Sequence, residues 1–295
     1  MFPPRWRRRR STGVGMTLTT AMNPALAFGS RSLPRPRPSR PRNSPPQRTL
    51  TPADAKELAL PATVTWMPNV ERARPKMAPA NSDLLNRELY DVALFRQPHR
   101  YPRQKNIQGL YFFTGVRNHV WHESQLEAQV MRWLDMRDDV VALSAQPFRI
   151  DFADGTSHTP DLLTLHSDHR QVLRDVKPRK YVPKFQEQFA KTRAFCEHVG
   201  LRYELHHELP RQVDVNLSWI AGFKHHGYRP RPEAISRTVD ALHRPLALRD
   251  AARLLDPDDL ARGRSGLYHL IWSGLLGFDL TAPISDRTLI ERLLP

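Results

Sequence analysis

Two strand-like runs joined by a short polar turn constrain this chain more than any other feature. Residues 161–165 and 171–177 are rich in strand-forming side chains, and such runs around a tight turn predict an antiparallel hairpin. With the turn at the tip, the pairing places Asp175 opposite Asp161. The period of two puts Lys177 on the same face as Asp175. The sequence therefore predicts two carboxylates and an ammonium group in one patch.

This pair of carboxylates predicts a bound cation. Like charges directly opposite each other destabilise a sheet, so Asp161 and Asp175 need compensation from a lysine or a divalent metal. Because only oxygen ligands are present, a hard ion such as Mg²⁺ fits best, with Mn²⁺ as a substitute. Such a centre is typical of metal-assisted phosphodiester hydrolysis and suggests a nuclease.

A helix beside the hairpin is expected to supply a third carboxylate. Residues 123–134 carry apolar side chains at helical spacing, and Glu127 lies at the edge of that stripe. The stripe consists of Leu126, Val130, Trp133 and Leu134. Ser124 also forms a capping-box pattern with Glu127, in which the glutamate only returns a hydrogen bond to the helix start. Glu123 lies four residues earlier on the same side and competes for the catalytic position.

A second helix and a further strand complete the predicted α/β core. Residues 184–200 predict a helix that ends at Gly200, and residues 201–205 predict a strand. Three lysines follow the Asp175 strand, where DNA phosphates would lie, and are expected to face outward: Lys180, Lys184 and Lys191. The alternative to DNA contact is that these lysines form an ordinary solvent-exposed helix face.

The ordered set of these motifs resembles a known nuclease family. Glu127, Gln146-Pro147, Pro160-Asp161 and Asp175-Val176-Lys177-Pro178 are similar to the PD-(D/E)xK core of TnsA-type transposon endonucleases, over roughly residues 110 to 205. Residues 267–272 and 275–280 resemble the small helical domain that follows the nuclease in that family. The implied fold class is α/β: a restriction-endonuclease-like core, with a mixed sheet flanked by helices, and a small, mainly α-helical C-terminal domain. A winged-helix-like arrangement is one expectation for that domain.

The resemblance also implies an activity and partners. A TnsA-like subunit cuts one DNA strand at each transposon end, while a TnsB-like transposase cuts and joins the other strand. A TnsC-like ATPase docks on the C-terminal domain in that family. Glu127, Asp161, Asp175 and Lys177 match the active-site positions. At the third position glutamate or glutamine is common, and this chain has the shorter aspartate.

The mechanism implied is hydrolysis assisted by one or two Mg²⁺ ions. Asp161, Asp175, the carbonyl of Val176 and Glu127 are the expected ligands. Lys177 would orient or deprotonate the attacking water, or shield the phosphorus. Two other classes of function stay open: a stand-alone restriction or repair endonuclease, and a DNA-binding module without catalysis.

Composition divides the chain into three parts. The first fifty residues hold eleven arginines, nine prolines and no acidic residue, against a net charge of +15 for the whole chain. Such a segment cannot bury apolar surface, so residues 1 to about 80 are predicted to be a disordered basic tail that binds phosphates non-specifically. Residues 81–209 then form the nuclease domain. Residues 210–295 form the helical DNA- or partner-binding domain, with helices expected at 232–242, 246–255 and 266–276, and a last one from 286.

Several other classes of protein are excluded. No stretch approaches the roughly 18 apolar residues of a membrane span, which predicts a cytoplasmic protein without a membrane partner. Cys196 is the only cysteine, so no intrachain disulfide and no cysteine zinc site can form. The absence of a Walker-type phosphate loop excludes an ATPase subunit.

Overall fold

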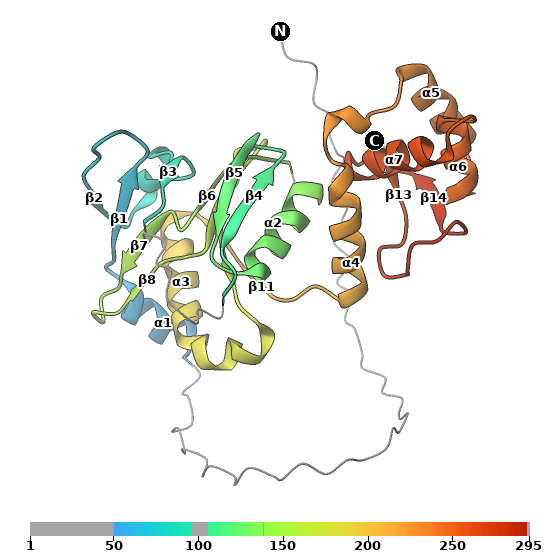
Figure 1. Cartoon of the computed structure of the whole chain (residues 1–295). Coiled ribbons are helices and arrows are strands. Elements are labelled where there is room, and N and C mark those ends of the chain that lie inside the picture. The colour runs from blue at the N-terminus through green and yellow to red at the C-terminus, as the bar shows by residue number, and fades with distance from the viewer. Residues whose placement is uncertain (1–49, 96–105, 138, 294–295) are drawn as a thin grey trace, which may run out of the picture. The chain divides into compact units, whose positions relative to one another are not determined.

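The computed structural model describes residues 50–95, 106–137 and 139–293, and these form a mixed α/β fold (Figure 1). The seven α-helices of this part are α1 Pro52–Ala59, α2 Gln125–Arg137, α3 Gln186–Val199, α4 Arg211–Ile220, α5 Pro232–Ala241, α6 Leu248–Leu255 and α7 Leu260–Trp272. None of them is long and apolar enough to cross a lipid bilayer.

Three sheets lie before α4. One has the order β2-β1-β7-β8, with β3 also paired to β1, and another has the order β11-β10-β9-β6. A third is the β4-β5 hairpin. Their strands are β1 Thr63–Pro68, β2 Lys76–Pro79, β3 Val92–Ala93, β4 Gly109–Phe113, β5 Asn118–His122, β6 Val140–Ala145, β7 Phe148–Asp151, β8 Ser157–His158, β9 Leu162–His166, β10 Gln171–Val176 and β11 Arg202–His206.

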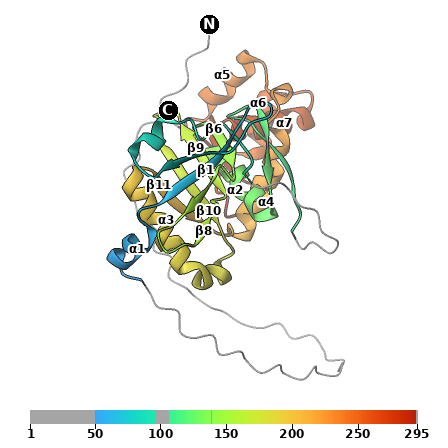
Figure 2. The same ribbon diagram turned by 90° about the vertical axis from the view of Figure 1, so that its left-hand side faces the viewer.

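The predicted hairpin is confirmed as β9 and β10, which lie beside β6 and β11 (Figure 2). The two strands pair antiparallel, with Leu173 opposite Leu163 and Arg174 opposite Leu162. Continuing that register puts Asp175 opposite Asp161, as the sequence predicts. The N–H of Asp161 donates to the carbonyl of Arg174 over 3.1 Å, so the pairing extends to the start of β9.

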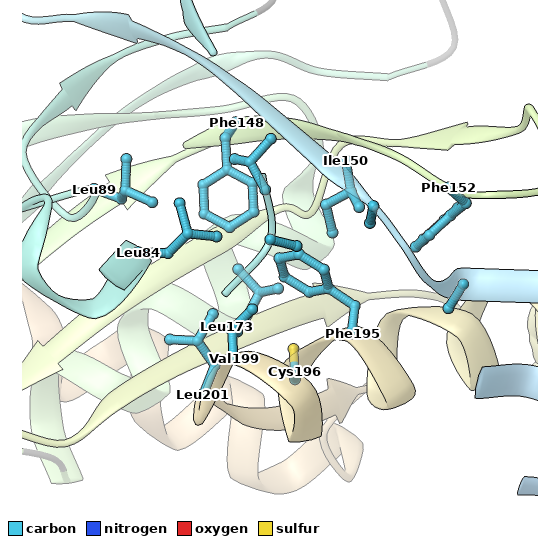
Figure 3. Packing of buried hydrophobic residues seen from close by; sticks show 14 of the residues in the cluster. Leu84, Leu89, Phe148, Ile150, Phe152, Leu173, Phe195, Cys196, Val199 and Leu201 are labelled. Atoms are coloured by element: carbon cyan, nitrogen blue, oxygen red, sulfur yellow. The ribbon is translucent and has the colours of Figure 1, made fainter. Parts of the chain in front are cut away.

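The hairpin separates two hydrophobic cores. Leu163 and Leu173 pack against α3 and against the sheet that contains β1 and β7. Figure 3 shows Leu173 among the residues of this core. Leu162 and Val176 face the other way, into the core formed with α2 and the β4-β5 hairpin. The period of two thus buries both faces of β9 and β10, and Leu162, Leu163 and Leu173 are each 0% exposed.

The predicted strand-helix-strand return after β10 is also confirmed. α3 ends at Gly200, whose φ of 88° is the left-handed conformation that glycine adopts most readily. β11 follows and pairs parallel with β10, with Asp175 beside Leu205. The central sheet is therefore mixed, because β9 is antiparallel to both of its neighbours.

The predicted disorder of residues 1 to about 80 is wrong for residues 50 to 80. Thr51 caps α1, and β1 joins the central part of its sheet by pairing with β2, β3 and β7. Val64 and Trp66 are buried on one face of β1, so the folded region begins well before residue 81. The averaged basic composition concealed this short apolar strand. Residues 1–49 lie outside the described residues.

The C-terminal part combines helices with a small sheet. α4 to α7 share a hydrophobic core with a three-stranded antiparallel sheet of order β12-β14-β13. Its strands are β12 Leu246–Ala247, β13 Leu276–Gly277 and β14 Leu289–Arg292. The helix predicted from residue 286 is wrong, because this segment becomes β14, in which Leu289 is exposed and Ile290 is buried.

The prediction that Lys191 lies on an outward face of α3 is wrong. Its side chain is only 4% exposed, and its Nζ lies 2.6 Å from Asp154 and 3.2 Å from Glu187. It also donates to the hydroxyl of Thr156 over 2.8 Å. Lys191 therefore ties α3 to the turn between β7 and β8, and it is no longer a candidate for DNA contact.

We expect Lys191→Ala to lower the free energy of unfolding by about 1 to 2 kcal/mol, because it removes a buried ammonium group that pairs with Asp154 and donates to Thr156. Lys56→Ala, at an exposed position of α1, should change it by less than about 0.5 kcal/mol. Urea denaturation of both variants measures the difference. Equal stabilities would contradict the buried ion pair.

Candidate active site

Asp161 is held at the entrance to β9 by the neighbouring strand. Pro160 precedes Asp161, and Oδ2 of Asp161 accepts a hydrogen bond from the backbone N–H of Val176 over 2.7 Å. Its side chain is therefore fixed against the end of β10, where Asp175 and Lys177 lie on either side of Val176. Asp161 is partly exposed as a whole residue, while its carboxyl group is buried.

The four predicted catalytic residues act on each other electrostatically. Burial raises the pKa of Asp161 well above its usual range, and the negative charges of Asp175 and Glu127 raise it further. The Val176 N–H and the Lys177 ammonium oppose this rise in the pKa of Asp161. The fold therefore brings the helix carboxylate, both strand carboxylates and the lysine into one neighbourhood.

Glu127 also forms the cap that its spacing predicted. Its Oε2 accepts from the N–H of Glu123 and its Oε1 accepts from the hydroxyl of Ser124, each over 2.8 Å. Ser124 Oγ in turn accepts from the N–H of Glu127 over 3.2 Å. Burial raises the pKa of Glu127, while these hydrogen bonds and Lys177 lower it. Glu127 thus both caps α2 and contributes charge to the site.

Gln146 connects Glu123, which lies just before α2, to the site. Its amide donates to Glu123 Oε2 over 2.9 Å, and its backbone N–H donates to the carbonyl of Asp161 over 2.8 Å. Gln146 has a φ of 45°, a left-handed conformation that is uncommon for a residue with a side chain. Its buried Oε1 has no hydrogen-bond partner. Glu123 is therefore bound to Gln146, whereas the charge of Glu127 acts on Asp161.

Lys177 follows β10 and is fixed by two backbone contacts. Its N–H donates to the carbonyl of His206 over 2.9 Å, and its own carbonyl lies 2.9 Å from His207 Nδ1. Its Nζ lies 4.7 Å from the centre of the Phe185 ring. The ammonium group is thus held between an aromatic ring and the acidic neighbourhood of Asp161.

Two lysines on the segment after the site each lie next to an aromatic ring. A 3-10 helix, η2 Arg179–Phe185, carries exposed Lys180 and Lys184. The Nζ of Lys180 lies 4.9 Å from the centre of the Tyr181 ring, and that of Lys184 lies 5.7 Å from the centre of the Phe185 ring. Of the three lysines predicted to contact DNA, these two are accessible.

Sequence reasoning missed two residues that contact Asp175. His158 Nε2 lies 2.9 Å from Asp175 Oδ1, and the Tyr203 hydroxyl donates to Oδ2 over 2.7 Å. His158 precedes Pro160-Asp161 by only two residues, which is the one signal that could have indicated it. Tyr203 reaches Asp175 only because β11 pairs with β10.

The oxygen atoms of this site suit a hard cation. In the part of the chain that is described, no three His, Cys, Asp or Glu side chains converge as a preformed metal cluster. Glu127 and Asp175 are instead held by protein donors. Asp161 and Asp175 nevertheless oppose each other with like charge. Gln146, whose backbone N–H donates to the carbonyl of Asp161, has a buried Oε1 without a partner. Oxygen donors with excess negative charge are what Mg²⁺ and Mn²⁺ bind.

Comparison with models of known protein families gives no match, and comparison with curated proteins gives none either. The likeness to TnsA-type endonucleases therefore stays a prediction from the motifs. The function is inferred from the geometry and chemistry of the residues described above.

Asp161→Asn is expected to stabilise the metal-free protein at neutral pH. A carboxyl whose pKa is higher in the folded state binds protons on folding, so stability falls as pH rises from the unfolded value of 3.8 through the raised folded value. Asparagine removes this loss and keeps an oxygen for the Val176 N–H. In EDTA, the gain in unfolding free energy over wild type should be small near pH 4 and grow toward neutral pH. A less stable variant at pH 7 would contradict the like-charge neighbourhood.

Proposed function

We propose that the chain is a metal-dependent DNA endonuclease, the TnsA-like subunit of a TnsA/TnsB-type transposase, with a PD-(D/E)xK core. The observation that carries the proposal is the register of β9 and β10, which sets Asp161 opposite Asp175. Lys177 follows two residues later, and Glu127 acts on Asp161 from α2. Asp175, Glu127 and Lys177 around Asp161 form an arrangement suited to phosphodiester hydrolysis.

A divalent cation would be held by oxygen atoms of three residues: the carboxylates of Asp161 and Asp175 and the carbonyl of Val176. Glu127 adds negative charge to the same neighbourhood. When bound, Mg²⁺ supplies activation of a water molecule and neutralises charge that develops on the phosphate. The unfavourable opposition of Asp161 and Asp175 supports this assignment, because a cation would relieve it.

The chain's own groups orient the reaction. Lys177 is placed to donate to the attacking water or to a phosphate oxygen, since its backbone is fixed by His206 and its Nζ rests over Phe185. The Val176 N–H keeps the Asp161 carboxylate facing the end of β10. Each group is thus oriented before DNA binds, which reduces the reorganisation needed during the reaction.

DNA would follow the segment after β10. Arg179, Lys180 and Lys184 are exposed there, directly after the catalytic lysine. Contacts from such side chains to phosphates hold the duplex in register without reading its sequence. The C-terminal helices with their three-stranded sheet form a small module. We propose that this module is winged-helix-like and either binds DNA or docks the TnsB-like or TnsC-like partner.

Strand-specific cleavage tests the proposed function. DNA that carries the proposed transposon end is incubated in Mg²⁺ with the purified chain, with and without the proposed TnsB-like transposase. Wild type should cut one strand only when the partner is present, and Asp175→Ala should abolish cutting, because it removes one of the two opposed carboxylates. Circular dichroism of the variant shows whether its fold is kept.

The outcome separates the competing functions. Cutting by wild type without the partner would favour a stand-alone restriction or repair endonuclease. Binding without cutting in either Mg²⁺ or Mn²⁺ would favour a non-catalytic DNA-binding module. Cutting by Asp175→Ala at the wild-type rate would contradict the proposed site.

The double variant Lys180→Ala, Lys184→Ala should weaken DNA binding equally for all sequences. Each lost contact between a lysine and a phosphate reduces the slope of log affinity against log salt by about 0.9, so loss of both contacts should reduce the slope by about 1.8. Fluorescence anisotropy at several salt concentrations measures this slope. Lys56→Ala, which alters an exposed lysine of α1, is the matched control. An unchanged slope in the double variant would exclude η2 from the DNA path.

A further inference from the structure

The carboxylate of Asp175 is held by side chains from two other strands. His158 of β8 places Nε2 at 2.9 Å from Oδ1 and 3.0 Å from Oδ2. Tyr203 of β11 donates its hydroxyl to Oδ2 over 2.7 Å. Asp175 is 1% exposed, so these donors replace the water that would otherwise solvate the charge.

A third residue determines which nitrogen of His158 carries the proton. The amide nitrogen of Gln188 in α3 lies 2.8 Å from His158 Nδ1. Because an amide nitrogen only donates, Nδ1 is the acceptor, and Nε2 must carry the hydrogen that Asp175 accepts. Gln188 and His158 therefore form a chain of donors that ends on the Asp175 carboxylate, and the Tyr203 hydroxyl donates to the same carboxylate separately.

These contacts leave the Asp175 carboxylate with unused acceptor capacity. A carboxylate has about four lone-pair sites, and the two donors use only part of them. The orientation of Asp175 is thus fixed without a cation.

We propose that His158 and Tyr203 are positioning residues that orient the Asp175 carboxylate for a divalent cation and so set the affinity of the site for that cation. This inference rests on the proposed metal-dependent function. Residues that hydrogen-bond a ligating carboxylate orient it, and their loss typically lowers metal affinity by about 10- to 100-fold. If the contacts only satisfied a buried carboxylate, their loss would lower stability and leave metal affinity unchanged.

Mn²⁺ binding to the full-length, DNA-free protein distinguishes these roles. Tyr203→Phe removes one donor with little change in shape, and its dissociation constant for Mn²⁺, measured by electron paramagnetic resonance, should rise about 10- to 100-fold. Tyr111→Phe is the matched control, because Tyr111 is another mostly covered tyrosine that donates to a carboxylate, that of Asp135, over 3.0 Å. The control should lose stability and keep wild-type Mn²⁺ affinity.

A pair of variants at His158 provides a second test that does not depend on Tyr203. His158→Leu removes the donor to Asp175, whereas His158→Gln retains an N–H group that can reach the same oxygen. Mn²⁺ affinity and the Mg²⁺ concentration for half-maximal cleavage should both worsen in His158→Leu. Both should recover in part in His158→Gln.

The inference and the proposed function fail in different ways. Wild-type Mn²⁺ affinity in both Tyr203→Phe and His158→Leu, with wild-type protein active, would overturn the positioning role and leave the nuclease proposal intact. If wild type neither binds Mn²⁺ nor cuts DNA, the proposed function is rejected, and the positioning role is rejected with it.

Discussion

The antiparallel register of β9 and β10 is the constraint on which the candidate site depends. Leu163 and Leu173 face each other in one core, and a shift by one residue would turn this whole set of side chains toward the opposite face. The same register puts Asp175 opposite Asp161. The apolar residues of the hairpin therefore fix the positions of the two carboxylates, although they take no part in the chemistry.

The site is locally unfavourable and is stabilised by its surroundings. Burial raises the pKa of Asp161, and the nearby negative charges of Asp175 and Glu127 raise it further. Protein donors compensate at each carboxylate: Val176 at Asp161, His158 and Tyr203 at Asp175, and the start of α2 at Glu127. Unfavourable arrangements of like charges are expected where a protein binds a ligand of opposite charge, because the ligand then compensates the repulsion.

The sequence predicted what short-range patterns determine. Alternation and turn chemistry located β9 and β10 with their register, and helical spacing with Gly200 located α3. Long-range packing determined the rest. The basic composition of the first part concealed β1. Lys191, predicted on the surface of a helix, is the buried partner of Asp154. The contact of Tyr203 with Asp175 exists only after β11 has joined the sheet.

The central claim is that Asp161 contributes to hydrolysis through its carboxylate and not through the fold. The most direct measurement compares DNA cleavage in Mg²⁺ by wild type and Asp161→Asn, under conditions in which wild type is active, together with the unfolding free energy of each. Asparagine keeps the shape of the side chain and an acceptor for the Val176 N–H. The account predicts that cleavage is lost while stability is equal or higher. Cleavage by Asp161→Asn at the wild-type rate would contradict it.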